Sequence, residues 1–147
     1  MPIITFLVHF FLLLCFLIYF GCKLNIMIIS GLFSICGITI LSIGIGFLTS
    51  SLSIYRKDIL YLLPNILQVG MFITPIFFSE SLVPDNFKFI LYINPIALYI
   101  KIFRACLFTS YEINIIDISI ACAITLIIVL FSYPLFKRTM EYAADTL

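Results

Sequence analysis

The charged residues divide the sequence into long uncharged stretches, and the lengths of these stretches predict the fold. A helix rises about 1.5 Å per residue, so about 20 apolar residues cross the roughly 30 Å hydrocarbon core of a membrane. Four stretches are long enough to do so. We therefore expect four membrane-spanning helices, at approximately residues 2–22, 26–52, 59–79 and 115–136.

The region between the third and fourth spans has a different pattern. It is apolar, but Lys101 and Arg104 interrupt it, and its uncharged runs are too short to cross a membrane. Asn94-Pro95 lies in its middle and indicates a turn, because the residue before a proline avoids the helical conformation. We predict a helical hairpin over approximately residues 84–110 that enters the membrane and returns to the same side.

The composition agrees with an all-α fold, a polytopic membrane helix bundle of about four transmembrane helices plus this short re-entrant hairpin. The 147 residues are 64% apolar and 10% charged, with a mean hydropathy of +1.28, whereas soluble domains carry about 25% charged residues. A soluble domain of this size buries only about two-thirds of its unfolded surface, so much of the apolar surface must face lipid. The net charge of +1 provides no basic stripe for a phosphate backbone, and we expect no nucleic-acid partner.

The first span has the length of a signal peptide but lacks its other features. No Lys or Arg precedes the apolar run, and Tyr19-Phe20 is too bulky for a cleavage site. We therefore interpret residues 2–22 as a retained helix within a single transmembrane domain.

Basic residues at the span ends predict the orientation of the chain. Pairs of basic residues at 56–57 and 137–138 are two spans apart, so they fall on the same side of the membrane. The numbers of Lys and Arg on the two sides are equal, but these pairs lie directly at span ends, which favours a cytoplasmic position for both. Both termini are then cytoplasmic, with a tail at 137–147. The expected cytoplasmic loop consists of Arg56, Lys57 and Asp58.

Small residues gather near one face of the second span. Ser30, Ser34, Gly37 and Gly44 lie there, and such positions let helices approach closely in lipid. Ordinary helix packing is the first interpretation, and an interface between subunits or along a translocation path is the second.

The sequence contains no complete catalytic or metal-binding group, and we expect no catalytic residue, cofactor or metal. The single histidine, His9, lies in the first span without partners for a triad or metal cluster, and we interpret it as interfacial rather than as a proton carrier. There is no P-loop motif, so energy from ATP would have to come from another chain. The five cysteines are scattered through apolar runs without metal-ligand spacing. They are Cys15, Cys22, Cys36, Cys106 and Cys122.

Several short motifs occur in a familiar order in the second half of the chain. They are YRKDILYLLP at 55–64, Leu67-Gln68, Thr74-Pro75-Ile76, Leu82-Val83-Pro84, Asn94-Pro95 and Phe103-Arg104, followed by Phe136-Lys137-Arg138, Glu141, Ala144-Asp145 and Leu147. This order resembles the ABC-2 type permeases that export bacterial surface polysaccharides, and most of all the O-antigen and lipopolysaccharide exporters. The resemblance covers only the C-terminal portion of such permeases.

The resemblance implies a homodimeric permease in the bacterial inner (plasma) membrane that works with a separate P-loop ATPase subunit and carries a lipid-linked polysaccharide. It implies that short re-entrant helices between Glu80 and Arg104 form a gate at the outer face. Aromatic faces could line a path for sugars, and Tyr92 and Tyr99 are the best placed. The expected gate and path residues are Pro75, Tyr92, Asn94, Pro95, Tyr99 and Arg104.

Other functions remain open at this point. The chain could be an inactive permease fragment, a structural subunit, or an integral membrane enzyme acting on lipid-linked substrates. Such an enzyme would need a carboxylate or histidine at a membrane boundary, and Asp58, Glu80 and Glu112 are the candidates. Copurification with an ATPase would favour the permease over these alternatives.

Overall fold

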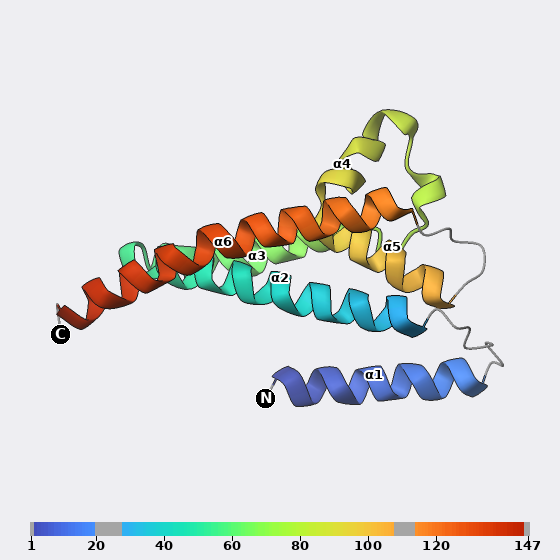
Figure 1. The fold of residues 1–147 in the computed structure, drawn as a ribbon, viewed down its shortest axis with the longest axis horizontal. Helices are drawn as coiled ribbons and strands as arrows, with labels where there is room; N and C mark the ends of the chain where they lie inside the picture. The colour runs from blue at the N-terminus through green and yellow to red at the C-terminus, as the bar shows by residue number, and fades with distance from the viewer. Residues whose placement is uncertain (1, 20–27, 108–113, 146–147) are drawn as a thin grey trace.

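The computed structural model describes residues 2–19, 28–107 and 114–145, and all regular structure within them is helical (Figure 1). This confirms the predicted all-α class for the described part of the chain. The helices are α1 (Pro2–Tyr19), α2 (Ile28–Tyr55), α3 (Asp58–Ile73), α4 (Lys88–Ile93), α5 (Pro95–Leu107) and α6 (Ile115–Asp145), with short 3-10 turns η1 (Glu80–Leu82) and η2 (Asp85–Phe87).

Within the described residues, two helices are long and apolar enough to cross a membrane. They are α2, over Ser30–Tyr55, and α6, over Ile115–Ala143. Both coincide with predicted spans. α6 continues to Asp145, so residues 137–145 of the expected tail extend the same helix.

The side chains of α6 are distributed in the opposite way to those of a soluble protein. Thr125, Ser132 and Thr139 are buried, whereas Leu130 and Phe131 are 61% and 70% exposed. Exposing large apolar side chains to water is unfavourable, and lipid removes that cost. The surface of α6 therefore suits a hydrocarbon environment.

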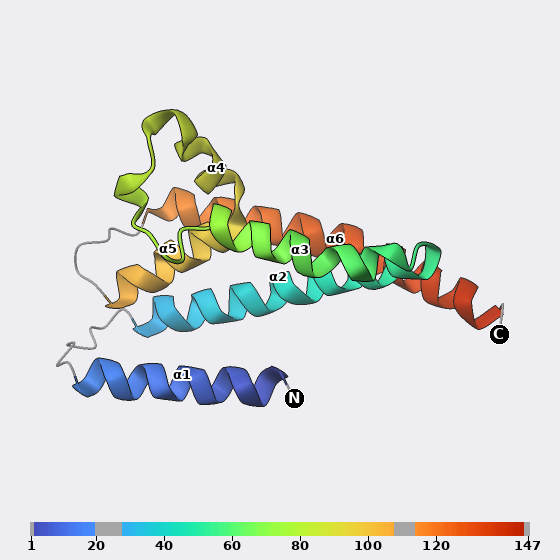
Figure 2. The same cartoon turned by 180° about the vertical axis from the view of Figure 1, so that it is seen from behind.

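The packed part of the molecule consists of α2, α5 and α6. α2 and α6 lie against each other, and α5 packs on both at one end (Figure 1). Leu98, Tyr99, Ile102 and Ala121 form the buried apolar cluster there. In both views α1 runs alongside α2 in the opposite direction, on the side away from α6 (Figure 2).

Two glycines of α2 allow this close packing. A Cβ atom at Gly37 would lie 2.2 Å from Cε1 of Tyr99 in α5, and one at Gly44 would lie 3.0 Å from Cγ2 of Val129 in α6. Ser34, on the same face, is fully buried. Part of the small-residue face of the second span therefore serves helix packing within the chain.

The third predicted span, 59–79, is helical only as α3, from Asp58 to Ile73. Thr74 has φ −84° and ψ 135°, the extended conformation expected before Pro75. At about 1.5 Å per residue a helix of this length reaches roughly 24 Å, which is less than the hydrocarbon thickness. The chain then continues as a non-helical segment to η1 and η2.

The region of the predicted hairpin contains two short helices, α4 and α5, separated at Asn94, and its entry into the membrane stays a prediction. This break lies where the Asn94-Pro95 signal placed it. Several sequence predictions fall outside the described residues. These are the limits of the expected elements at 20–22, 26–27, 108–110 and 146–147, together with Cys22 and Glu112.

Candidate functional site

The two ends of the helix bundle carry different charged groups. At one end the rings of Tyr55 in α2 and Tyr142 in α6 stack with their centroids 6.4 Å apart. The exposed loop of Arg56, Lys57 and Asp58 turns the chain into α3 there, and Lys137-Arg138 lies nearby in α6. The two basic pairs therefore lie at the same end of the bundle.

The opposite end holds a charge cluster, defined here as Glu80, Lys101 and Asp117. Lys101 Nζ lies 2.7 Å from Asp117 Oδ2 and 4.0 Å from Glu80 Oε2. The side chain of Asp117 is 4% exposed, and a buried carboxylate is stable only when paired. Lys101 therefore connects α5 to the first turn of α6 and, less closely, to η1.

Arg104 joins α5 to the non-helical segment that follows α3. Its Nη2 donates to the carbonyl oxygen of Ile76 at 2.9 Å, and its Nη1 donates to that of Phe78 at 3.2 Å. These carbonyls lie outside any helix and so accept no helical backbone hydrogen bond. The guanidinium provides the donors instead.

Asn94 makes a second connection to the same segment. Its Nδ2 donates to Thr74 Oγ1 at 2.9 Å, and its Oδ1 accepts from the backbone N–H of Ile96 at 3.1 Å. The latter bond caps the N-terminus of α5, and Pro95 occupies the first helical position, where no N–H is needed.

Four of the expected gate residues thus come together. Pro75 is fully buried next to Thr74. Asn94, directly before α5, and Arg104, in its last turn, bond the segment at 74–78, and Pro95 is the first residue of the helix. We call Thr74, Pro75, Asn94, Pro95 and Arg104 the gate network.

The two tyrosines expected along a sugar path have different surroundings. Tyr99 is 1% exposed, its hydroxyl lies 3.0 Å from Thr125 Oγ1, and its ring covers Gly37. The tight α2–α5 contact encloses the ring of Tyr99, and its stacking role along a sugar path stays a prediction. Tyr92 is 47% exposed and available.

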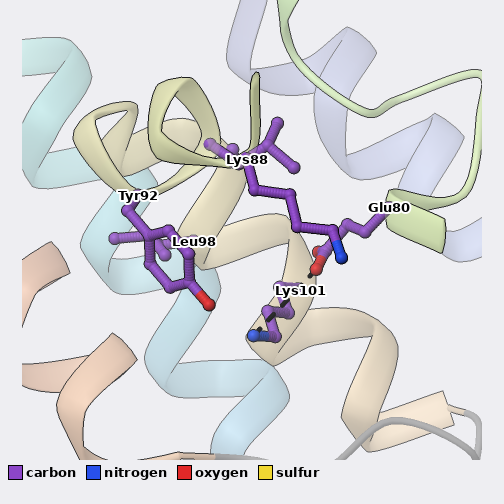
Figure 3. Close-up of a pocket in the computed structure, with 7 residues that line it drawn as sticks. Glu80, Lys88, Tyr92, Leu98 and Lys101 are labelled. Carbon is purple, nitrogen blue, oxygen red and sulfur yellow. Dashed lines mark ion pairs between the residues drawn. The ribbon is translucent and has the colours of Figure 1, made fainter. Parts of the chain in front are cut away.

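Tyr92 lines a cavity of about 210 Å³ between α4, α5 and η1 (Figure 3). Burial raises the pKa of Glu80, although the nearby cations Lys101 and Arg104 oppose this shift. At the outer edge Lys88 bonds Asp85 at 2.6 Å, which lowers the pKa of that carboxyl group. The cavity is lined by Glu80, Lys88, Leu91, Tyr92, Ala97, Leu98 and Lys101.

The candidate acids of the enzyme hypothesis do not come together in the described ranges. Asp58 is exposed in the loop at the other end of the bundle, and Glu80 belongs to the charge cluster. No three His, Cys, Asp or Glu side chains in that part of the chain could hold a metal ion. His9 in α1 is exposed, with Nδ1 2.7 Å from the carbonyl oxygen of Thr5.

The Lys101–Asp117 pair and the Thr74–Asn94 bond are two of the contacts that the sequence interpretation missed. A usable signal existed for the first, since Asp117 opens a long apolar helix and an acid in that position needs a cation nearby. Comparison with known proteins adds no relative: no protein-family model, curated protein or solved structure matches this chain. The resemblance to export permeases therefore depends on the motif residues themselves.

Proposed function

We propose that this chain is the permease subunit of an ATP-driven exporter of lipid-linked surface polysaccharide, of the O-antigen or capsule type. The observation that carries the proposal is the gate network: Pro75, Asn94, Pro95 and Arg104 are motif residues far apart in sequence, and they meet at one end of the bundle. In this proposal the network lies at the outer face, and the loop at 56–58 and both termini are cytoplasmic.

Four helices span the bacterial inner membrane in this proposal. The apolar outer surface of α6 and its buried hydroxyl groups support a lipid environment. α1 provides a further apolar helix, and α3 provides the fourth span together with the segment after it.

The short length of α3 gives the gate network a physical role. Non-helical backbone at membrane depth is tolerated only where protein or water satisfies its polar groups. Arg104 satisfies two such carbonyls, at Ile76 and Phe78, and Asn94 bonds the side chain of Thr74 at the end of α3. Movement of α5 would release these contacts together, which is the behaviour of a gate.

The partners follow from the same proposal. The chain pairs with a second copy of itself, and a separate P-loop ATPase subunit binds at the cytoplasmic end, where ATP binding drives the rearrangement. The substrate is a lipid-linked polysaccharide, and no cofactor, metal or nucleic acid takes part.

The test is an Arg104→Ala variant in cells that carry the complete transporter. We expect surface polysaccharide to fall strongly while the amount of the chain in the membrane is unchanged. Leu126→Ala, at an exposed position of α6 outside the motifs, is the control and should leave export normal. Normal surface polysaccharide in the Arg104→Ala strain would refute the proposal.

An integral membrane enzyme acting on lipid-linked substrates is the alternative, and Glu80 is the observation that favours it. Its carboxyl group is partly buried in a cavity beside Lys101. Under this alternative, Glu80→Gln would stop synthesis of the lipid-linked polymer. Under the permease proposal the polymer is still made, and only its export is affected.

A further inference from the structure

The cavity beside the gate network is built from three separate elements. Glu80 comes from η1, Lys88 and Tyr92 come from α4, and Lys101 comes from α5. Figure 3 shows the side chains of Glu80, Lys88 and Lys101 converging on the same space, with the ring of Tyr92 forming one wall. A site made from several elements depends on the fold, unlike a chance group of surface residues.

The walls of the cavity combine an aromatic face with groups that form hydrogen bonds. The ring of Tyr92 is nearly half exposed, and Leu91 and Leu98 add apolar surface. The contact of Glu80 with Lys101, at 4.0 Å, is too long for a hydrogen bond, so the carboxylate oxygens retain capacity to accept one. Lys101 is fixed by Asp117 and presents its remaining N–H groups near Tyr92, with Nζ 5.9 Å from the ring centroid.

The size and charge of the cavity restrict its ligand. Its volume, about 210 Å³, is below the roughly 300–1,000 Å³ of pockets that hold drug-sized molecules. Its two cations each face a carboxylate, since Lys88 pairs with Asp85 and Lys101 with Asp117. A small, uncharged ligand with an apolar face and several hydroxyl groups fits this arrangement best, and a sugar ring has these properties.

We propose that this cavity binds one uncharged sugar ring, stacked on Tyr92 and hydrogen-bonded through its hydroxyl groups to Glu80 and Lys101. As the source of the sugar is the exported chain, the inference rests on the proposed function. It deepens that function by placing a single-residue sugar subsite between α4 and α5, next to the gate network. An occupied subsite would hold α4 against α5 and couple the presence of substrate to the position of the gate.

The test measures binding of simple sugars to the full chain. The protein is reconstituted in lipid nanodiscs rather than maltoside detergent, because the sugar headgroup of such a detergent would compete. Saturation-transfer-difference NMR then follows the methyl glycosides of glucose, galactose, mannose and rhamnose, with glycerol as a polyol that has no ring. We expect at least one glycoside to bind saturably and glycerol not to bind.

Variants assign the binding to the cavity. Tyr92→Leu should weaken binding about three- to tenfold, the range expected for loss of one aromatic contact, whereas Tyr92→Phe should retain it. Phe89→Leu is the matched control, because Phe89 is an exposed aromatic residue of α4 that does not line the cavity. Glu80→Gln should weaken binding through loss of a charged acceptor. Far-UV circular dichroism verifies that each variant keeps its helices.

The outcomes separate the two proposals. Absence of glycoside binding, equal binding of glycerol, or equal losses in Tyr92→Leu and Phe89→Leu would overturn the cavity assignment. If export depends on the chain but no sugar binds, only the cavity assignment fails. If a glycoside binds in a Tyr92-dependent way but export is independent of the chain, the cavity assignment stands and the exporter function fails.

Discussion

Replacement of Gly37 by alanine should destabilise the packing of α5 on α2. The new Cβ atom would lie 2.2 Å from Cε1 and 2.5 Å from Cζ of Tyr99, whereas carbon atoms in contact prefer about 3.5–4.0 Å. The ring must therefore retreat by about 1.3 Å or more, the difference between about 3.5 Å and the present distance. It has little room, because it is 1% exposed and its hydroxyl contacts Thr125.

The magnitude follows from three effects. Overpacking a tight core costs about 1–3 kcal/mol, and loss of the Tyr99–Thr125 hydrogen bond adds about 1 kcal/mol. Replacing glycine by alanine in a helix returns about 1 kcal/mol. The expected net destabilisation is about 1–3 kcal/mol.

The assay is thermal unfolding of the reconstituted protein, followed by circular dichroism at the helical band. Gly37→Ala should lower the apparent midpoint by several degrees. Gly46→Ala is the control in the same helix, because no heavy atom lies within 4 Å of its Cβ position, and its midpoint should stay equal or rise. In a Tyr99→Leu background, Gly37→Ala should cost much less. A midpoint for Gly37→Ala equal to or above the wild-type value would refute the close packing described for α2 and α5.

Three further predictions concern Lys101 and Asn94, which hold α5 in place, and Glu80, which lies beside Lys101. Lys101→Met leaves Asp117 buried without its cation and should cost about 2–4 kcal/mol in thermal unfolding, and the double variant with Asp117→Leu should recover most of this loss. Asn94→Ala removes the cap of α5 and its bond to Thr74, and the same assay should show a loss of about 0.5–2 kcal/mol, whereas Asn94→Asp keeps the cap. Because burial raises the pKa of Glu80 in the folded state, the contribution of Glu80 to stability should be greatest below the ordinary glutamate pKa and should fall as pH rises through the raised one. The difference between the midpoints of the wild-type protein and Glu80→Gln should show this fall across the pH range, and a difference that does not change with pH would contradict the described burial.

The helical class and the positions of the long helices could be predicted from sequence because they depend on local length and hydropathy. α2 and α6 follow from the uncharged runs on either side of the charged residues. The break at Asn94-Pro95 is also local, since proline restricts the residue before it. The early end of α3 had the same kind of signal, because Thr74 precedes Pro75. The sequence prediction followed the apolar run to residue 79 instead and made the helix too long.

The pairing of distant side chains could not be predicted in this way. Whether Lys101 pairs with Asp117 depends on where α5 crosses α6, and no local pattern determines that crossing. Tyr99 illustrates the same limit, because the sequence interpretation named its ring as a possible stacking surface along a sugar path. The tertiary contact with Gly37 encloses it instead.

The structure supports one part of the predicted membrane orientation, the position of the two basic pairs on the same side. The basic pairs at 56–57 and 137–138 lie at the same end of the bundle, as Tyr55 and Tyr142 show by their contact. The cytoplasmic assignment of this end stays a prediction. Cysteine accessibility tests this assignment. A Lys57→Cys variant should react with impermeant reagents only from the cytoplasmic side. The native cysteines Cys36 and Cys122, which are exposed within the helices, provide the comparison.

Deletion of the gene in its native organism tests the exporter proposal most directly, with separate measurement of surface polysaccharide and of lipid-linked polymer inside the cell. The proposal predicts that the surface polymer is lost while the lipid-linked polymer accumulates on the inner side, and that the wild-type gene restores export. Unchanged surface polysaccharide would contradict the proposal. Loss of the polymer from both sides would contradict it in favour of the enzyme alternative.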